Sequence, residues 1–286
     1  MIKKVSILLL AAALLLTLIV CFLVKEPTIH CYYLRSDISS QLNTEGDAEF
    51  LYPGRSKGLA LFQNEDAAPE RTFSFQGTEY TVSYSFSAYA GPVTFYNDYY
   101  DNTASRISAA FSSRTGELTY VIYLRESADL SPVAVDQIPE LEAVARQAAA
   151  ENFGITDIGT YTLRACDNSQ TEVWFYFAKY INGLPTSDEI RVSVYSDGTV
   201  MCITQFDVGM ITEKHTKALK IFAEADIDAL IANTVPEGSD LYVDEIKYLQ
   251  YAVTPKGDVV IYATVTYGDT ASSWQHYYAD LIFALK

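Results

Sequence analysis

The sequence has few of the residues from which catalytic and metal sites are built. Its three histidines, His30, His215 and His276, are far apart, so the metal-binding pattern of two histidines four residues apart is absent. The 14 glycines form no phosphate-binding loop and no dinucleotide fingerprint, and no Gly-x-Ser-x-Gly elbow is present. Because a serine or cysteine needs an adjacent base to become a strong nucleophile, we expect no catalytic residue, no cofactor and no metal. The sequence predicts a protein that is not an enzyme.

The isolated histidines have plain structural interpretations. His215 lies in the polar segment EKHTK and is expected to be a solvated loop residue. His276 lies in WQHYYADLIF and is expected to be a strand residue that faces its neighbours. The 36 carboxylates fall mostly in turns and helix ends, and no spacing selects two of them as a glycosidase pair.

Basic residues are scarce compared with acidic ones. The chain has 20 lysines and arginines against 36 aspartates and glutamates, which gives a formal net charge of -16. Such a charge repels nucleic acid and anionic lipid surfaces. We therefore exclude nucleic acid as a partner, and the sequence does not indicate an oligomeric state.

Charges are missing altogether from one stretch near the start. Lys3 and Lys4 precede an uncharged apolar run over residues 5–24, and 20 residues at about 1.5 Å each span the hydrocarbon layer of a membrane. We expect residues 1–24 to be an uncleaved signal anchor, with the bulk of the chain outside the cell membrane. The run lacks a small-residue cleavage site, but a secreted protein with a cleaved signal remains an alternative, as does a lipoprotein with a lipid on Cys21.

Cysteines are also few. Of the four, Cys21 lies in the apolar run and Cys31 just beyond it, so Cys166 and Cys202 are the pair that could form a disulfide outside the cell. Four cysteines in a chain of this length make no disulfide framework, and two free buried thiols are the alternative.

What the sequence does contain is a repeated hairpin pattern. Each copy is a strand of alternating apolar residues, a polar turn that closes on a glycine, and a second strand. Glycine suits these turns because it adopts positive φ without a Cβ clash. The pattern suggests three related sheet units, although separate glycine hairpins are common in any antiparallel protein. The copies are residues 107–123 with Gly116, residues 190–206 with Gly198, and residues 248–265 with Gly257.

Two helices are predicted between the hairpins. Residues 136–152 have Pro139 in the first turn, Gly154 just after the end, and one apolar stripe rich in alanine that suits close packing on a sheet. A second helix is predicted over about residues 224–233, and two strands are expected over residues 160–165 and 173–180.

These elements predict an α+β fold of two to three small units after an N-terminal transmembrane helix. Each unit is expected to be an antiparallel β-meander with a helix packed on one face. The expected regions are a signal anchor (1–24), a juxtamembrane spacer (25–70), an N-terminal β-rich unit (71–130), a helix-plus-sheet unit (131–212) and a C-terminal helix-plus-hairpin unit (213–286).

Tyrosine is abundant, with 22 residues. Many tyrosines fall in predicted strands, where an amphipathic ring suits a half-wet sheet face. Residues 97–102, NDYYDN, do not match a calcium loop and are interpreted as an ordinary hairpin tip. Tyr96, Tyr99 and Tyr100 are the aromatic residues that could bind a sugar or a peptide there.

Residues 132–210 resemble a known family. The aromatic strand that runs into Asn182-Gly183-Leu184-Pro185, the alternating valines that follow and the turn at Asp197-Gly198 look like the PepSY-type module of secreted peptidase propeptides and of YcdB-like repeat proteins of Gram-positive bacteria. The resemblance implies a non-catalytic module that binds or restrains a peptidase, or regulates another exported protein at the cell envelope. No peptidase domain follows residue 209, so the partner would be another chain.

The sequence therefore predicts a non-catalytic, membrane-anchored extracellular protein that acts by binding a protein or peptide. Two alternatives stay open. One is a surface module that binds glycans or peptides through its tyrosine-rich faces, and the other is a membrane-anchored regulator of a sensor kinase.

Overall fold

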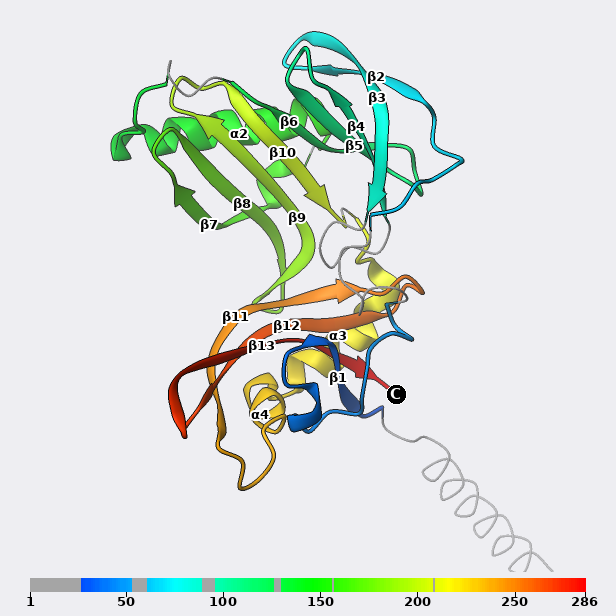
Figure 1. Cartoon of the computed structure of the whole chain (residues 1–286), viewed down its shortest axis with the longest axis vertical. Coiled ribbons are helices and arrows are strands. Elements are labelled where there is room, and N and C mark those ends of the chain that lie inside the picture. Colours follow the sequence, from blue (N-terminus) through cyan, green and yellow to red (C-terminus); the bar gives the residue numbers. More distant parts are fainter. Residues whose placement is uncertain (1–26, 53–60, 89–95, 126–129, 156, 208) are drawn as a thin grey trace, which may run out of the picture.

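The strands of this chain join into one sheet that runs through two lobes (Figure 1). The computed structural model describes residues 27–52, 61–88, 96–125, 130–155, 157–207 and 209–286. The sheet has 13 strands in the order β1-β13-β12-β11-β9-β10-β6-β5-β4-β3-β2, with β7 and β8 branching from β9. Neighbouring strands are antiparallel except for β9 and β11, which are parallel.

The first lobe contains nine of these strands, and we call it the β2–β10 lobe. Its strands alternate between residues buried in one hydrophobic core and residues on the opposite face, as expected for period-two patterning. The strands are β2 (Glu70–Phe75), β3 (Thr78–Ala88), β4 (Asn97–Asn102), β5 (Ile107–Ser112), β6 (Leu118–Tyr123), β7 (Thr162–Asn168), β8 (Glu172–Ile181), β9 (Leu184–Tyr195) and β10 (Val200–Phe206).

The core of this lobe lies between the sheet and helix α2 (Ile138–Phe153), which follows the 3-10 turn η3 (Val135–Gln137). Proline near the first position of α2 and Gly154 at its end, with φ of 63°, delimit the helix as the sequence predicted. Its buried residues are Leu141, Ala145, Ala148 and Ala149, and the small alanines let the helix approach β8, β9 and β10 closely. The prediction of this helix and of its apolar stripe is confirmed.

The second lobe, the β11–β13 lobe, has longer strands. They are β1 (Ile29–Ser36), β11 (Leu241–Val253), β12 (Val259–Asp269) and β13 (Ser272–Leu285). Helices α3 (Thr216–Glu224) and α4 (Ile227–Ala232) contact β12 and β11. The single helix predicted over residues 224–233 therefore corresponds to α4, and α3 was not predicted. Short 3-10 turns are η1 (Ser39–Gln41), η4 (Ile158–Thr160) and η5 (Glu213–His215).

The two lobes are joined by β9. Strand β10 pairs with β9 only from Glu189 onward, because β9 is longer than its hairpin partner. The first residues of β9 therefore keep a free edge on that side, and Thr186 pairs there with Tyr251 of β11. The expected fold of two to three small separate α+β units is wrong, because this pairing fuses the strands into one 13-stranded mixed sheet.

The N-terminal predictions have different outcomes. The expected transmembrane helix over residues 5–24 lies outside the described residues. Within the described part of the chain, no helix is both long enough and apolar enough to cross a membrane. Residues 29–36, inside the predicted spacer, form β1, which pairs with β13 from Ile29↔Leu285 to Ser36↔Ala279.

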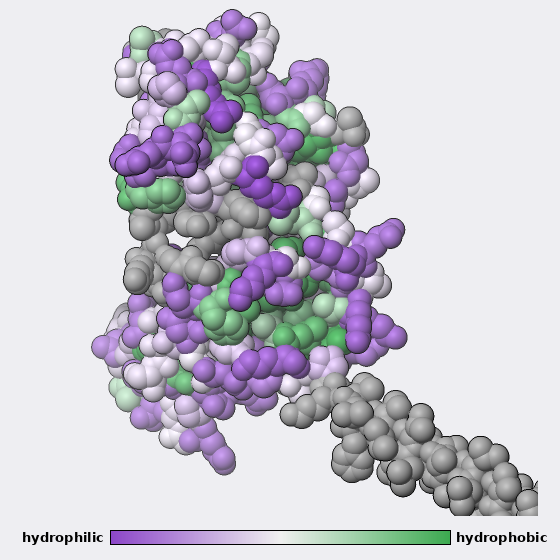
Figure 2. All heavy atoms as spheres, turned by 90° about the vertical axis from the view of Figure 1, so that its right-hand side faces the viewer, coloured by the Kyte–Doolittle hydropathy of each residue, from purple (hydrophilic) through white to green (hydrophobic). Residues whose placement is uncertain are grey.

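The three predicted hairpins are confirmed as β5–β6, β9–β10 and β11–β12. Their turn glycines, Gly116, Gly198 and Gly257, have φ of 71°, 84° and 87°, which explains why glycine occupies each turn. On the side of the molecule in Figure 2, hydrophilic residues cover most of both lobes and hydrophobic residues occupy smaller areas among them.

Candidate functional site

The candidate site is the face of the β2–β10 sheet that α2 does not cover, which we call the open face. On the central strands the residues that face α2 are buried, while many of their neighbours on the open face are large and only half-buried. Helices α3 and α4 lie on the other lobe. The half-buried aromatic residues of the open face are Phe86, Tyr99, Tyr120, Trp174, Tyr176 and Phe206.

Strand register aligns many of these side chains in one row across the sheet. Each member pairs directly with the next across an antiparallel ladder, so their side chains are neighbours on the same face. We call this set the aromatic row. In order from β3 to β7 it is Phe86, Tyr99, Ala110, Tyr120, Thr204, Arg191, Tyr176 and Ala165.

The rings of the row contact one another. Phe86 and Tyr99 are stacked, with ring centroids 4.8 Å apart and an interplanar angle of 14°. The centroids of Tyr99 and Tyr120 are 6.1 Å apart. Burial raises the pKa of Tyr99 and, together with the nearby Cys202 thiol, the pKa of Tyr120, so both phenols are neutral at physiological pH. Such a surface offers flat, amphipathic contact area with little side-chain entropy to lose.

A cation completes the row at its β9 position. The Arg191 guanidinium lies 4.8 Å from the ring centroid of Phe206 and 5.5 Å from that of Tyr176. Its Nε donates to the buried carboxylate of Glu189 at 2.5 Å. Burial alone would lower the pKa of Arg191, but the charge and hydrogen bond of Glu189 outweigh it and raise the pKa. Arg191 is thus a permanently charged group fixed among aromatic rings.

Glu189 also links the row to the second lobe. Its carboxylate accepts hydrogen bonds from Arg164 Nη1 at 3.2 Å and from the Tyr248 hydroxyl of β11 at 3.0 Å. The guanidinium of Arg164 stacks on the Tyr248 ring, with its central carbon 4.0 Å from the centroid. With 2% of its surface exposed, Glu189 is a buried charge balanced by two arginines and a hydroxyl.

The neighbouring residue of β9 is buried and paired in the same way. The Asp188 carboxylate accepts from the Tyr161 hydroxyl at 2.5 Å and from the backbone N–H of Gly209 at 3.0 Å. Lys179 Nζ lies 3.4 Å from it. Burial and the hydrogen bond to Asp188 raise the pKa of Tyr161. These contacts fix the start of β9, where the two lobes meet.

Small, buried residues of the open face lie beside the aromatic row. Ser193 of β9 pairs with Cys202 of β10, and Trp174 of β8 lies on the other side of Ser193. The Ser193 hydroxyl is fully buried and has no hydrogen-bond partner among the described residues. Burial raises the pKa of Cys202 from 9.0 to about 11, so its sulfur is a neutral thiol and a poor nucleophile. The Ser193 hydroxyl and the neutral Cys202 thiol are therefore suited to non-covalent contacts.

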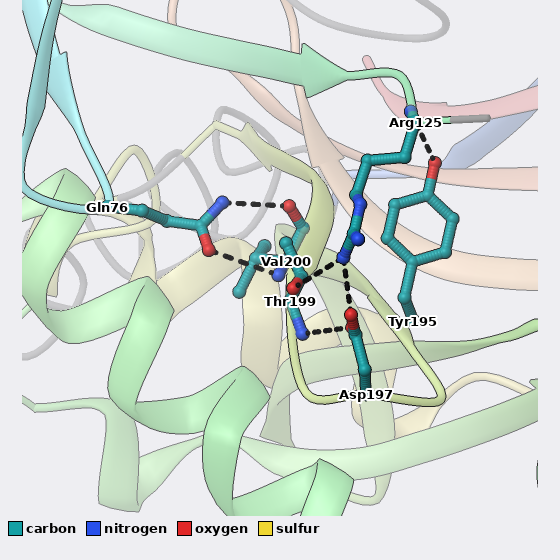
Figure 3. Close-up of polar contacts among 6 residues, drawn as sticks. All are labelled: Gln76, Arg125, Tyr195, Asp197, Thr199 and Val200. Atoms are coloured by element: carbon teal, nitrogen blue, oxygen red, sulfur yellow. Dashed lines mark hydrogen bonds and ion pairs between the residues drawn. The ribbon is translucent and has the colours of Figure 1, made fainter. Parts of the chain in front are cut away.

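The hairpin that carries Arg191 and Ser193 is held from both sides (Figure 3). The side chain of Gln76, in the β2–β3 turn, pairs with the backbone of Val200: Nε2 donates to its carbonyl at 2.9 Å and Oε1 accepts from its N–H at 3.3 Å. Arg125, which follows β6, pairs with Asp197 and donates to the Thr199 hydroxyl at 3.2 Å. These contacts hold the turn of the β9–β10 hairpin, whose strands carry Arg191 and Thr204 of the aromatic row.

The three tyrosines predicted to bind a ligand do not share one face of the sheet. Tyr99 belongs to the aromatic row, and Tyr96 contacts Phe62 edge-on at 5.1 Å. Tyr100 points into the core, with 0% of its surface exposed, and contacts Phe111 at 5.4 Å. Tyr100 is therefore not available to a ligand, because successive strand residues face opposite sides. A binding role for Tyr96 and Tyr99 stays a prediction.

The disulfide considered between Cys166 and Cys202 is absent, since both are free thiols. Cys166 lies on β7 and Cys202 on β10, and β8 and β9 separate these strands. Three strand spacings amount to about 14 Å. A disulfide requires Cα atoms about 4.4–6.8 Å apart, so the two cannot pair without a large rearrangement.

The predictions for His276 and His215 have different outcomes. His276 lies in β13, as expected, with Nδ1 3.3 Å from Asp244. The interpretation of His215 as a solvated residue is wrong, because 5% of its surface is exposed. Its Nδ1 accepts from the backbone N–H of Thr212 at 3.0 Å, so Nε2 carries the proton and donates to the Gly257 carbonyl at 3.0 Å. It secures the β11–β12 turn. Within the described ranges, no three histidine, cysteine or acidic residues are grouped as a metal site would require.

Sequence reasoning missed Arg191, Glu189 and Trp174. The alternation of Ile190, Val192 and Val194 predicts one buried face for β9, and the residues between them must then face the other way. That parity was the available signal for Arg191. Glu189 is two residues from its partner Arg191, but its other partners lie on β7 and β11, and no local pattern reveals those contacts.

Comparisons with known proteins add little. No family model matches the sequence, and no curated protein matches it either. A solved structure, the C-terminal domain of YpeB from Bacillus megaterium, is loosely similar. The match has a TM-score of 0.32 and 10% sequence identity, and it covers 81% of this chain and 87% of that one. A TM-score this low does not establish a common fold.

Proposed function

We propose that this chain is a non-catalytic protein that binds and regulates another exported protein at the cell envelope, with a peptidase as the first partner class to test. It is anchored in the cell membrane by residues 5–24, with the bulk outside. The observation that carries the proposal is the aromatic row on the open face. It presents aromatic rings and one fixed cation across eight strands on the face opposite α2, and its β9 position borders Tyr248 of the second lobe.

The physical argument concerns the composition of the face. Protein-binding surfaces are enriched in tyrosine, tryptophan, phenylalanine and arginine, and their strongest contacts combine such residues at a well-packed centre. Tyr120, Trp174 and Arg191 supply this chemistry within one sheet face. The buried Cys202 thiol and the saturated Glu189 carboxylate leave recognition, rather than bond cleavage, as the chemistry these groups support.

Site-specific photo-crosslinking in the organism that encodes the chain tests the proposal. A photoreactive phenylalanine at Tyr120 samples the open face, and the same residue at Gln147, exposed on α2, is the matched control. We expect one exported protein to be linked from Tyr120 and not from Gln147. Equal labelling from both positions, or none from either, would reject the proposal.

The nature of the linked molecule decides between functions. Aromatic rings beside a cation can also hold sugars, which keeps the glycan alternative chemically reasonable. Linkage of Tyr120 to cell-wall glycan in place of a protein would assign that alternative. Linkage to a membrane kinase would assign the sensor-regulator alternative.

A further inference from the structure

Strand β7 is an edge of the β2–β10 sheet. It pairs with β8 on one side, from Thr162↔Ala178 to Asn168↔Val173. On its other side no described strand is paired, and the backbone of residues 162–168 makes no hydrogen bond outside the ladder to another described residue. An open edge of this kind is a template for a further strand.

The fold protects a comparable edge elsewhere. The outer edge of β1 is covered by residues 45–48 through three backbone hydrogen bonds. They run from Glu45 N–H to the Cys31 carbonyl at 2.8 Å, from Tyr33 N–H to Gly46 at 3.0 Å, and from Ala48 N–H to Tyr33 at 2.8 Å. The open edge of β7 therefore contrasts with an edge that the chain itself fills.

The two faces of β7 differ in chemistry. Leu163 and Cys166 pack against the core beneath α2. Ala165 and Asp167 lie on the open face beside the end of the aromatic row, where Ala165 pairs with Tyr176 and Asp167 with Trp174. A strand added to β7 would thus meet apolar groups on one face, and a carboxylate and aromatic rings on the other.

Charge selects the kind of strand. Residues 136–179, which contain α2, β7 and most of β8, hold seven carboxylates against three cations. Asp167 is exposed on β7 itself. An extended segment with lysine or arginine on the open face would be attracted, whereas a second copy of this chain, with a net charge of -16, would be repelled.

We propose that the outer edge of β7 binds an extended segment of the partner protein as an added strand, with cationic side chains over Asp167 and apolar side chains on the α2 side. This inference rests on the proposed function and names the chemistry of the segment. It extends the aromatic row by one strand, since the residue opposite Ala165 would be the next member of the row, with the small Ala165 between it and Tyr176.

A peptide of alternating lysine and valine tests the inference on the full chain in detergent, with binding followed by fluorescence anisotropy. We expect Asp167→Lys to weaken binding about 10-fold, because an attractive cross-strand pair becomes repulsive. Asp167→Asn should have a smaller effect in the same direction. Glu70→Lys on β2, the edge strand at the other end of this sheet, is the matched control and should change the affinity less than about 2-fold.

Three results would overturn the inference. They are equal binding of the lysine and glutamate versions of the peptide, equal weakening by Asp167→Lys and Glu70→Lys, and a dimer of the chain that Asp167→Lys dissociates. The crosslink from Tyr120 separates the two proposals. If it persists while the peptide fails to discriminate, only the β7 inference falls, and if both fail, the proposed function falls with it.

Discussion

The two lobes cover their sheets differently. In the β11–β13 lobe each face of the sheet carries a buried core: α3 and α4 cover one, and the segment with Ala48, Leu51 and Tyr52 covers the other. Near one end of these strands Tyr242, Trp274 and Tyr278 remain exposed. In the β2–β10 lobe, α2 covers one face and leaves half-buried aromatic residues on the opposite one. The central part of the β11–β13 sheet is therefore packed on both faces, whereas the β2–β10 sheet has one face covered by a helix and one open face.

The contrast separates stability from recognition. Residues buried between two layers contribute mainly to the free energy of unfolding, since they lose both packing and transfer energy when truncated. Residues on the open face contribute less, because solvent already reaches them. Under the proposed function, their large rings serve mainly for contact with another molecule.

The largest effect on stability is expected from a substitution that breaks the connection between the two lobes. Glu189→Ala would leave Arg164 and Arg191 without their buried partner and remove the acceptor of Tyr248. We expect the free energy of unfolding to fall by about 3–5 kcal/mol, measured by urea denaturation. Unfolding should also separate into two transitions, one for each lobe.

The control for Glu189 is Glu142, whose half-exposed carboxylate pairs with Arg146 one helical turn away at 2.9 Å. Glu142→Ala should cost about 0.5 kcal/mol and keep a single transition. Equal losses for the two variants would contradict a structural role for Glu189 at the junction.

The junction also marks the limit of what the sequence could predict. The hairpins followed from Gly116, Gly198 and Gly257, and α2 followed from Pro139 and Gly154, because these signals are local. The pairing of Thr186 with Tyr251 joins distant residues and leaves no local pattern, so the continuous sheet was missed.

The candidate site was predictable only in part, for a similar reason. In β4, NDYYDN, polar residues flank both tyrosines, so no apolar alternation reveals which of them faces the core. Tyr99 and Tyr100 were therefore grouped together, although they lie on opposite faces. In β9 the valines did reveal the parity, and Arg191 could have been placed from them.

A second pair of substitutions compares covered and open faces directly. Leu51→Ala removes a buried side chain from the covering segment of the β11–β13 lobe, and we expect a loss of about 3 kcal/mol in the free energy of unfolding. Tyr120→Ala, on the open face, should cost about 1 kcal/mol but abolish partner binding. Both are measured by denaturation and by partner pull-down. A greater loss of stability for Tyr120→Ala would remove the distinction between the faces.

The buried Cys202 thiol of the open face is expected to make the stability of the folded state depend on pH. The pKa of Cys202 is raised from 9.0 to about 11 by burial, so the folded state holds the proton more tightly than the unfolded state. Its stabilising contribution is complete below about pH 9 and is lost as the pH rises toward 11. The difference in unfolding free energy between the natural chain and Cys202→Ala should shrink by about 2 kcal/mol over this window.

Cys166→Ala is the matched control, because that thiol is only half-buried on the edge strand β7. Its pKa is also raised by burial, but water reaches this side chain, so the corresponding change with pH should be smaller. The measurement is urea denaturation at a series of pH values. A flat difference for Cys202→Ala would show that this thiol is not shielded by the sheet.

The smallest expected effect concerns the turns, which the two lobes support by different means. In the β2–β10 lobe Gln76 pairs with both backbone groups of Val200, and in the β11–β13 lobe His215 bonds to the Gly257 carbonyl. Gln76→Ala should cost about 1 kcal/mol, since two backbone groups lose partners where water can partly replace them. Gln205→Ala, which loses one bond to the Leu118 carbonyl, should cost about half as much. Amide hydrogen exchange in Gln76→Ala provides the measurement. We expect faster exchange at Val200 and unchanged exchange in the β11–β12 turn, because each lobe holds its own hairpin independently. Faster exchange in both turns would instead show that the shared strand β9 transmits the effect of the substitution.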